Sequence, residues 1–490
     1  MNLPGFVGGS YQSDSATVDS ERTINWYVER TESPGATAQQ VLYPIPGMSE
    51  IADGVTGPGR AHFEEDGREF AVIGTTLWEI ASNGTKTSRG TVAIDSNPAT
   101  ISSNGDGGGE LWITSGTNGY IFDLTANTLT QIAAMNGKAT MGGHLDGYFL
   151  TLDASTSTLW VSDLLDGTTW SGTQFLQRSD NPDPWIGMKV VHRYVWLFGQ
   201  DTSTVMFDSG ASPFPLEIHP AGVLPWGCAA AFSPAELQGA VYWLGASEGG
   251  HAMVLRATGF TPDRISTHPL QKAIEGLASI SDATGDVYED RGHTFYLLSI
   301  PDAKITYVWD DQSRLWCERG TWLQDDREYG VWRPQWHAHA FGEHRWLDSG
   351  SGKVYKSDHS VGTDADGTEI RRLRRTPPIQ FEGERMFFSS LELDLETGLG
   401  LQTGQGSDPQ VSMRSSNDGG RQWSSEAWRS AGKVGKYLTR VRWNRQGAAR
   451  RRVYEFVVSD PIPWRLANAY LTMGQPPTGL SQVEQANWGG

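Results

Sequence analysis

Residues 148–163 read YFLTLDASTSTLWVSD, two apolar-rich segments joined by a polar turn. Apolar and polar side chains alternate in each segment, as they do in a strand with one buried face. Six similar segments occur elsewhere in the chain, at intervals of about 38 to 53 residues. They are EFAVIGTTLWEI (69–80), ELWITSGTNGYIFDL (110–124), YVWLFGQDTSTVMFDS (194–209), VYWLGASEGGHAMVLRA (241–257), TFYLLSIPDAKITYVWD (294–310) and HRWLDSGSGKVYKSD (344–358).

Weaker strand-like segments lie between these copies, for example GRAHF (59–63), ATISS (99–103) and WIGMKVV (185–191). A repeat of about 40–50 residues with four strands is typical of a propeller blade, and radial stacking of blades leaves few exposed strand edges. We therefore predict an all-β chain with a β-propeller of six or seven blades. An open β-sandwich with similar hairpins is the alternative.

The composition agrees with short strands joined by tight turns. Of 490 residues 58 are glycine, and aromatic residues make up 11%. Disordered chains lack aromatic residues, and helical bundles are not rich in glycine. One short amphipathic helix is predicted at residues 268–280, because Leu270, Ile274 and Leu277 recur at helical spacing after Pro269.

Three regions are expected along the chain. Residues 1–57 form an N-terminal arm, residues 58–360 the propeller, and residues 361–485 a β-sandwich-like domain. The leucines of LELDL (391–395) point one way and the acidic residues the other, as in an antiparallel strand with one wet face. The arm is a candidate to pack with this domain as a platform. The tail at 477–490 is expected to be loose.

Several protein classes are disfavoured by simple features of the sequence. Cys228 and Cys317 allow one disulfide at most, and two buried free thiols are favoured. The first residues, MNLPGFVGGSYQSDS, have neither the positive start nor the apolar run of a signal peptide. No apolar stretch approaches the length of about 18 residues that a membrane span needs. A soluble protein made in a cytoplasm is expected.

Charge is distributed unevenly along the chain. The formal net charge is −18, but residues 371–452 contain 16 Lys and Arg against 8 Asp and Glu. That segment carries +8 and the rest of the chain −26. An acidic chain is a poor binder of nucleic acid, because phosphate contacts supply most of the affinity for DNA. The asymmetry suggests that different regions meet different partners.

The clearest local motif is SNDGGRQW, which matches the pattern S-x-D-x-G-x-x-W of the Asp-box found in sialidases and other propellers. Asp418 is expected to cap the turn from Ser416, Gly420 to take a conformation that other residues resist, and Trp423 to pack beneath. The Arg-Ile-Pro signature of sialidases is absent from the sequence. The motif therefore predicts a hairpin fastener and no active site.

Other motifs give no convincing catalyst or ion site. His337, His339 and His344 alternate near a strand, but spacing places no further ligand beside them, so exposed strand histidines are favoured over a metal site. TDADGTE (363–369) departs from the EF-hand pattern, and GDGGGE (105–110) lacks the Lys-Ser/Thr of a phosphate loop. Both are interpreted as turns. We expect no enzyme activity, no metal and no cofactor.

Two basic clusters are candidates for partner docking. They lie at a linker and at a strand start, without the interleaved aromatic platform of a nucleic-acid site. Docking to an acidic protein surface or mere solvation is favoured over DNA recognition. The clusters are Arg371, Arg372, Arg374 and Arg375, and Arg450, Arg451 and Arg452.

Three ordered segments resemble a known family. They are SERTINWYVERTESPGATAQQVLYPIPGM (20–48), ATGFTPDRISTHPLQKAIE (257–275) and KYLTRVRWNRQGAARRRVYEFVVSDPIPWRLANAYL (436–471). They resemble segments of the packaged-DNA stabilisation protein, also described as the tail hub or nozzle, of short-tailed bacteriophages. The similarity elsewhere is one of rhythm.

The resemblance implies a structural virion protein in the phage tail, made in the host bacterial cytoplasm. Its copies would form a ring, a hexamer in that family, below the portal and its adaptor or head–tail connector. The ring would retain packaged double-stranded DNA and give it a channel at ejection, without sequence-specific binding. Some relatives also contact a tail needle, a tail fibre or a tailspike. The family brings no catalytic residues to this sequence.

Two functions from other classes remain as alternatives. One is a phage tail-associated carbohydrate-binding module, which would expose a cluster of tryptophans on one face; the chain has 20 tryptophans. The other is a propeller glycosidase acting on host polysaccharide. Activity on a glycan without added ions would favour the enzyme.

Overall fold

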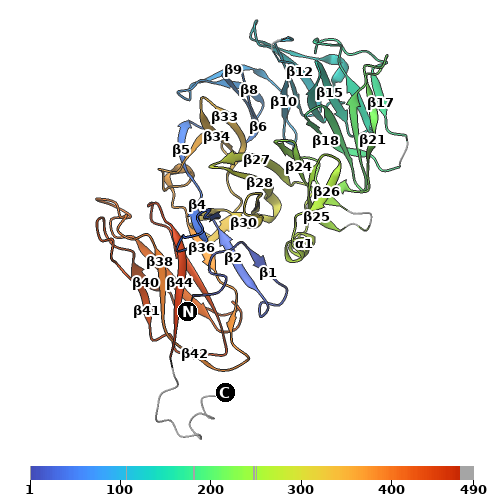
Figure 1. Ribbon diagram of the computed structural model, residues 1–490. Coiled ribbons are helices and arrows are strands. Elements are labelled where there is room, and N and C mark those ends of the chain that lie inside the picture. The colour runs from blue at the N-terminus through green and yellow to red at the C-terminus, as the bar shows by residue number, and fades with distance from the viewer. Residues whose placement is uncertain (1, 106, 180–181, 247–248, 250, 475–490) are drawn as a thin grey trace. The chain divides into compact units, whose positions relative to one another are not determined.

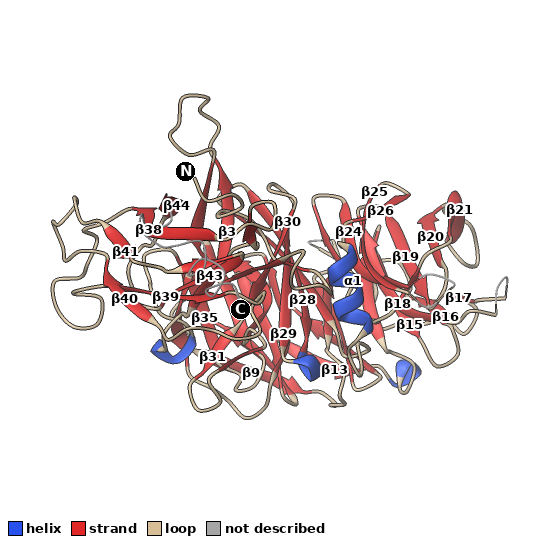
Figure 2. Cartoon of the chain, turned by 90° about the horizontal axis from the view of Figure 1, so that it is seen from below, coloured by secondary structure: helices blue, strands red, loops and turns tan. Residues whose placement is uncertain are grey.

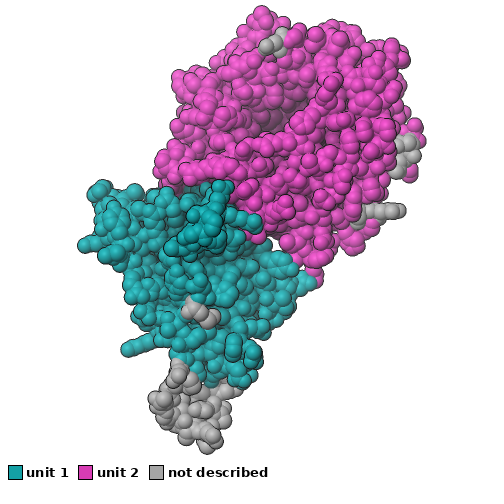
Figure 3. Space-filling model, in the orientation of Figure 1, with its two compact units in different colours: residues 1–45, 369–490 teal, residues 46–368 magenta. Residues whose placement is uncertain are grey.

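The computed structural model describes residues 2–474, except residues 106, 180–181, 247–248 and 250. The described residues form two compact units (Figure 3). Unit 1 consists of the described residues of Met1–Ile45 and of Glu369–Gly490. Unit 2 consists of the described residues of Pro46–Thr368. Part of the expected N-terminal arm, residues 46–57, therefore belongs to unit 2. The tail at 477–490, expected to be loose, lies outside the described residues.

Unit 2 contains seven successive sheets, each built on four antiparallel strands. The first four are β6 (Gly59–Glu65), β7 (Arg68–Ile73), β8 (Thr76–Ile80) and β9 (Lys86–Thr91); β10 (Thr100–Ser103), β11 (Glu110–Ser115), β12 (Asn118–Asp123) and β13 (Thr128–Gln131); β14 (Met141–Leu145), β15 (Tyr148–Asp153), β16 (Thr158–Val161) and β17 (Phe175–Gln177); and β18 (Trp185–Val191), β19 (Tyr194–Gly199), β20 (Ser203–Asp208) and β21 (Leu216–Leu224).

The remaining three sheets follow in chain order. They are β22 (Gly227–Cys228) and β23 (Ala235–Leu237), which share one position, with β24 (Ala240–Ala246), β25 (Ala252–Thr258) and β26 (Thr261–Arg264); β27 (Thr284–Asp290), β28 (His293–Ile300), β29 (Ile305–Asp310) and β30 (Leu315–Arg319); and β33 (Pro334–Ala340), β34 (Glu343–Asp348), β35 (Val354–Asp358) and β5 (Gly47–Ala52).

The first strands of these sheets form a closed ring. Along the described chain, β6 contacts β10, and contacts continue through β14, β18, β23 and β27 to β33, which contacts β6. Figure 1 shows the sheets arranged around the centre that these strands surround. The predicted β-propeller is confirmed, and among the described residues it has seven blades.

The strand β5, from the start of the unit, closes the ring as the fourth strand of the seventh blade. It pairs antiparallel with β35, with Met48 opposite Ser357 and Ala52 opposite Val354. Residues 47–52 were assigned to the arm by the sequence, because they stand outside the repeat. Only three strands of the seventh blade, β33 to β35, come after β30 in the chain. The fourth strand, β5, comes from the start of the unit and covers the open edge of the blade.

The seven repeated segments seen in the sequence are the second and third strands of the seven blades. The second strands are buried on both faces, and β7 for example is buried at five of its six positions. Apolar clusters fill the space between neighbouring blades, as where the Trp112 ring lies 4.8 Å from that of Trp170 and 6.2 Å from that of Phe149. The weaker segments between the repeats include first strands of blades, which line the centre.

One helix, α1 (His268–Glu275), is shorter than predicted. The Thr267 side chain caps it by accepting from the Leu270 amide, and Gly276 follows its last residue, five positions before the predicted end. Leu270 and Ile274 are buried in the cluster between the fifth and sixth blades, and α1 lies beside β25 (Figure 2). Unit 2 also contains β31 (Thr321–Leu323), β32 (Glu328–Gly330) and the 3-10 helices Ala133–Met135, Pro301–Ala303 and Ala365–Gly367.

Unit 1 contains two sheets that combine strands from both ends of the chain. The first has β1 (Tyr11–Gln12), β2 (Ser20–Ile24), β36 (Arg372–Arg375), β37 (Ile379–Gln380), β39 (Gln410–Ser416), β40 (Ala427–Ser430) and β43 (Arg451–Val458). The second has β3 (Trp26–Arg30), β4 (Gln40–Pro44), β38 (Met386–Leu395), β41 (Val441–Asn444), β42 (Ala448–Ala449) and β44 (Leu466–Gly474).

The two sheets of unit 1 pack face to face. The Trp443 ring on β41 lies 6.0 Å from that of Phe456 on β43, and Leu391 and Leu393 on β38 are buried, as their alternation predicted. The β-sandwich predicted for the C-terminal region is therefore confirmed. Four of its strands, β1 to β4, come from the first 44 residues.

Candidate functional site

The SNDGGRQW segment forms a tight turn after β39. The Ser416 hydroxyl donates to Asp418 Oδ1 at 2.7 Å, and the same oxygen accepts from the amides of Arg421 and Gln422 at 3.0 and 2.9 Å. The hydrogen bonds from Gln422 and Ser416 lower the pKa of Asp418 below its ordinary value. Gly420 has a φ of +98°, where a side chain would be strained. The geometry is that of a fastened turn.

The tryptophan of this turn lies against two arginines. The guanidinium groups of Arg375 and Arg414 lie 5.0 and 4.7 Å from the Trp423 ring centroid, a cation–π distance. Both arginines donate to the buried carboxylate of Glu455, Arg375 at 2.7 Å and Arg414 at 2.6 Å. The turn, β36 and β43 are thus tied together. Arg375, a predicted docking residue, is bonded within unit 1.

Arg374 lies in the interior and holds the start of the chain. Its side chain is 0% exposed, and it donates to the carbonyls of Phe6 and Gly9 at 2.6 and 2.9 Å and to the hydroxyl of Thr23 at 2.7 Å. It also pairs with Glu21. A guanidinium has five donors, so one side chain can fix several turns of an irregular segment. Arg374 is not available to a partner on the surface.

Two further arginines of the predicted docking set are buried. Arg372 is 1% exposed and donates to the carbonyl of Ile370 at 3.2 Å. Arg452 donates to Asn417 Oδ1 in the fastened turn at 2.9 Å, and its guanidinium lies 4.3 Å from the Phe388 ring centroid. β36 and β43 are buried at nearly all of their positions, so these side chains lie inside unit 1. Two consecutive arginines in a sequence suggest an exposed segment, but here one arginine of each such pair faces the core.

Three members of the predicted docking set remain at the surface. Arg450 is exposed, Arg451 is half-buried and bonds Gln380 Oε1 at 3.1 Å, and Arg371 is half-buried with Glu426 at 3.9 Å. The seven arginines therefore do not form one surface patch. Reversing the whole cluster from Arg371 to Arg375 would break internal contacts of unit 1 as well as any contact with a partner.

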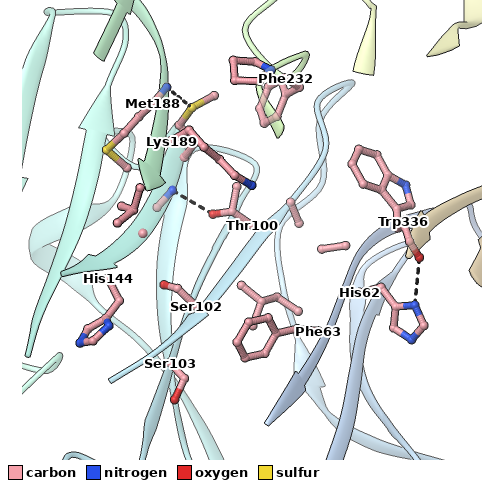
Figure 4. A pocket seen from close by; sticks show the side chains of 18 of the residues that line it. His62, Phe63, Thr100, Ser102, Ser103, His144, Met188, Lys189, Phe232 and Trp336 are labelled. Atoms are coloured by element: carbon pink, nitrogen blue, oxygen red, sulfur yellow. Dashed lines mark hydrogen bonds between the residues drawn. The ribbon is translucent and has the colours of Figure 1, made fainter. Parts of the chain in front are cut away.

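A cavity of about 650 Å³ occupies the centre of the propeller (Figure 4). It is lined by first strands, among them β6, β10, β14, β18, β27 and β33. Asp286 on β27 lies in its wall and accepts from the His337 and Val287 amides at 2.7 and 2.8 Å. Burial raises the pKa of Asp286 to about 6. Lys189 on β18 lines the same space, and burial lowers its pKa.

The predicted strand histidines are not all exposed. His337 and His344 are half-buried, and their Nε2 and Nδ1 atoms lie 2.9 Å apart, whereas His339 is exposed. Burial and the neighbouring imidazoles lower the pKa of His337 well below its ordinary value, and burial lowers that of His344. In the part of the chain that the structure describes, no group of three His, Cys, Asp or Glu residues could hold a metal.

The remaining motifs have structural surroundings. Asp366, in the 363–369 segment, pairs with Lys353 at 2.6 Å and Arg333 at 2.7 Å, and its pKa falls to about 2 despite partial burial. The 105–110 segment joins β10 to β11, and its residue 106 lies outside the described residues. Cys228 and Cys317 are both buried and unbridged. No described helix has the length and apolarity needed to cross a bilayer.

Family models match both units. The model described as "Bacteriophage P22 Gp10, beta-propeller" matches residues 1–355, and the model described as "Bacteriophage P22 Gp10, beta-sandwich" matches residues 371–474. The chain belongs to the bacteriophage P22 Gp10 family. It is thus a phage tail protein of a structural family, with a propeller and a β-sandwich, as the resemblance implied. No curated protein sequence matches it.

Several solved structures match this P22 Gp10 family member at low sequence identity. The N-terminal domain of Nup159 is 9% identical, with 69% of this chain and 99% of that chain covered and a TM-score of 0.40. The computationally designed Ika8 protein is 10% identical, with 69% of this chain and 99% of that chain covered and a TM-score of 0.38. PorZ of Porphyromonas gingivalis is 10% identical at a TM-score of 0.36, with 70% of this chain and 44% of PorZ covered. These values carry no functional information.

Sequence reasoning missed the charged groups around the propeller centre. Arg345 on β34 is 1% exposed and pairs at 2.6 Å with Glu69 on β7, which also lies 2.8 Å from His62 Nε2. This network joins the seventh blade to the first. Charged residues inside apolar strands were the available signal, because a group such as Arg345 between His344 and Trp346 needs a partner when the strand is buried.

Proposed function

We propose that this chain is the tail nozzle of a short-tailed phage. Its copies form a six-membered ring below the portal and its adaptor or head–tail connector, retain the packaged DNA and provide its channel at ejection. The observation that carries the proposal is the match of both units, over residues 1–355 and 371–474, to the P22 Gp10 family. The protein would be made in the host cytoplasm and reside in the virion tail, where a needle, fibre or tailspike is a further candidate partner.

The charge distribution supports this role. A channel wall that passes DNA without retaining it should carry negative or neutral charge, because basic walls bind phosphates. The chain outside residues 371–452 carries −26. Arg371, Arg450 and Arg451 are candidates to meet an acidic surface of the connector or of a neighbouring copy, where charges mainly set the rate and register of association.

A phage with a stop codon in this gene tests the proposal. Its particles should package DNA and then lose it, and they should lack the lower tail. Nuclease-protected DNA per head and tail occupancy in electron micrographs are the measurements. Complementation with the wild-type gene should restore both. Particles that keep their DNA and carry complete tails would contradict the proposal.

The docking residues are tested in the same complementation. Arg450→Glu with Arg451→Glu should restore tail attachment poorly, and the defect should be largest at low ionic strength, since screening weakens an exposed charge contact. The matched control is Arg291→Glu, an exposed arginine of unit 2, which should complement fully. Equal complementation by both would show that the two sandwich arginines are only solvated.

A further inference from the structure

The centre of the propeller holds a lysine without a bonded partner. The half-buried ammonium group of Lys189 forms no hydrogen bond or ion pair with any described residue, and burial lowers its pKa. Figure 4 shows its side chain reaching into the space between Thr100, Phe232 and Trp336. An ammonium group has three donors, and an internal one is stable only when solvent or a ligand accepts from it.

An acceptor faces the same space. Each carboxylate oxygen of Asp286 accepts one backbone amide, and each therefore keeps a free lone pair. Asp286 and Glu236 act electrostatically on Lys189 and favour its charged form. A site with a cationic donor and an anionic acceptor suits a neutral ligand that has both donors and acceptors.

An aromatic side chain is fixed at the cavity by an unusual backbone. Trp336 has a φ of +56°, and the register of β33 shifts between Gln335 and His337, which is a β-bulge. Left-handed backbone is costly for a bulky residue and is often kept where a side chain must be aimed. The indole nitrogen donates to the Gly59 carbonyl at 2.9 Å, and the Trp336 carbonyl accepts from His62 Nδ1 at 2.9 Å.

Two phenylalanine rings complete the lining. Phe63 and Phe232 lie on other sides of the cavity (Figure 4). Ligand sites of about 300–1,000 Å³ typically combine apolar rings with a few convergent polar groups, and this cavity has both features and a volume of about 650 Å³.

We propose that the central cavity of the propeller binds a neutral pyranose sugar. The C–H face of the sugar packs against the Trp336 ring, and its hydroxyls accept from Lys189 and donate to Asp286. The sugar is either free or a residue of a glycan. This site is independent of the proposed nozzle role, because it uses the centre of a single propeller and requires no ring.

The test uses the full-length protein and a panel of defined probes. These are D-glucose, D-galactose, L-rhamnose, N-acetyl-D-glucosamine and their methyl glycosides, with phosphate and acetate as anionic probes. Saturation-transfer NMR should give saturable binding of at least one sugar in the millimolar range. A bound methyl glycoside indicates a glycan residue as the source, and binding restricted to reducing sugars indicates a free sugar.

The position of binding is measured on the wild-type protein by amine labelling and mass spectrometry. Saturating sugar should reduce the labelling of Lys189 at least threefold and leave that of the exposed Lys304 unchanged. Lys189→Met should weaken binding at least tenfold. Lys304→Met is the matched control and should bind as the wild type does.

Three results would overturn the proposal. The first is that no sugar of the panel gives saturable binding. The second is sugar binding that neither protects Lys189 from labelling nor weakens in Lys189→Met, because the sugar would then lie elsewhere. The third is tighter binding of phosphate or acetate than of any sugar, which would make the cavity an anion site. If Lys189→Met does not fold, the labelling of the wild-type protein decides.

Discussion

In both the propeller and the sandwich, a segment from the start of the chain packs against strands that come much later in the sequence. The contacts that fix this segment differ between the two units. In the propeller, β5 adds a complete strand to the seventh blade and buries Met48 at 3% exposure. In the sandwich, much of the irregular segment before β2 is held by one buried side chain, Arg374. Backbone pairing distributes stability over many bonds, whereas a central guanidinium concentrates it. We therefore expect the sandwich to depend more on a single residue.

Replacing Arg374 should have the largest effect. Arg374→Met leaves the carbonyls of the first turns and the carboxylate of Glu21 without their donor, and removing one partner of a buried ionic network costs about 3–5 kcal/mol. The unfolding transition of the sandwich should move to lower denaturant while that of the propeller stays. Urea unfolding followed by hydrogen exchange separates the two.

Arg450→Ala is the control for that experiment, since the side chain is exposed and its loss should change the free energy of unfolding by less than about 0.5 kcal/mol. If Arg374→Met and Arg450→Ala unfold alike, the segment before β2 is held by other contacts.

Removing the apolar anchor of β5 should have the second largest effect. Met48→Ala empties a buried site in the seventh blade, and such truncations cost about 2–5 kcal/mol. The loss should appear in the propeller and spare the sandwich, the reverse of Arg374→Met. Glu50→Ala changes the same strand at its partly exposed pair with Lys353 and should have little effect. Unchanged propeller stability in Met48→Ala would mean that the ring stays closed without β5.

Acidification should destabilise the propeller through His337 and His344. Their pKa values are lowered in the folded state, so below about pH 6.5 the unfolded chain binds more protons than the folded chain. The free energy of unfolding therefore decreases as the pH decreases. Asp286, whose pKa is raised to about 6, acts in the opposite direction between about pH 4 and 6. His337→Gln should make the loss of stability on acidification smaller, and Asp286→Asn should make it larger. The urea midpoint at pH 7.5, 6.5 and 5.5 measures this loss. His251→Gln, an exposed control, should follow the wild type.

The smallest effect is expected in the fastened turn. Asp418→Ala removes an exposed acceptor for two amides, which water can partly replace. The sandwich should lose a little stability, and tail attachment and any ligand binding should not change. A thermal melt of the variant beside the wild type measures this. A normal melt together with lost binding would instead make the turn a functional site.

The comparison also shows which parts of the fold a sequence reveals. The segment 148–163 and its six counterparts were found because each copy buries the same two strands against neighbouring blades, so the pattern recurs. The strand β5 was missed because it lies about 300 residues from its partner β35 and stands outside the repeat. The end of α1 was missed because Leu277 continues the helical spacing beyond the cap at Gly276.

The site residues divide in the same way. The turn at Ser416–Trp423 is a local structure, and its hydrogen bonds follow from residues within eight positions. The exposure of the arginines at 371–375 and 450–452 depends on how deeply β36 and β43 are buried in unit 1, and a charge pattern alone does not show that depth. Lys189 and Asp286 line one cavity only in the folded ring, so the sequence of neither strand predicts the other residue.

An asymmetric cryo-EM map of the complete virion would show whether this chain forms the nozzle. We expect six copies of the chain in a ring on the tail axis, directly below the head–tail connector, with DNA or the plug of the channel inside the ring. A map that places the chain at the periphery of the tail, or in copies that do not surround the axis, would contradict the nozzle function.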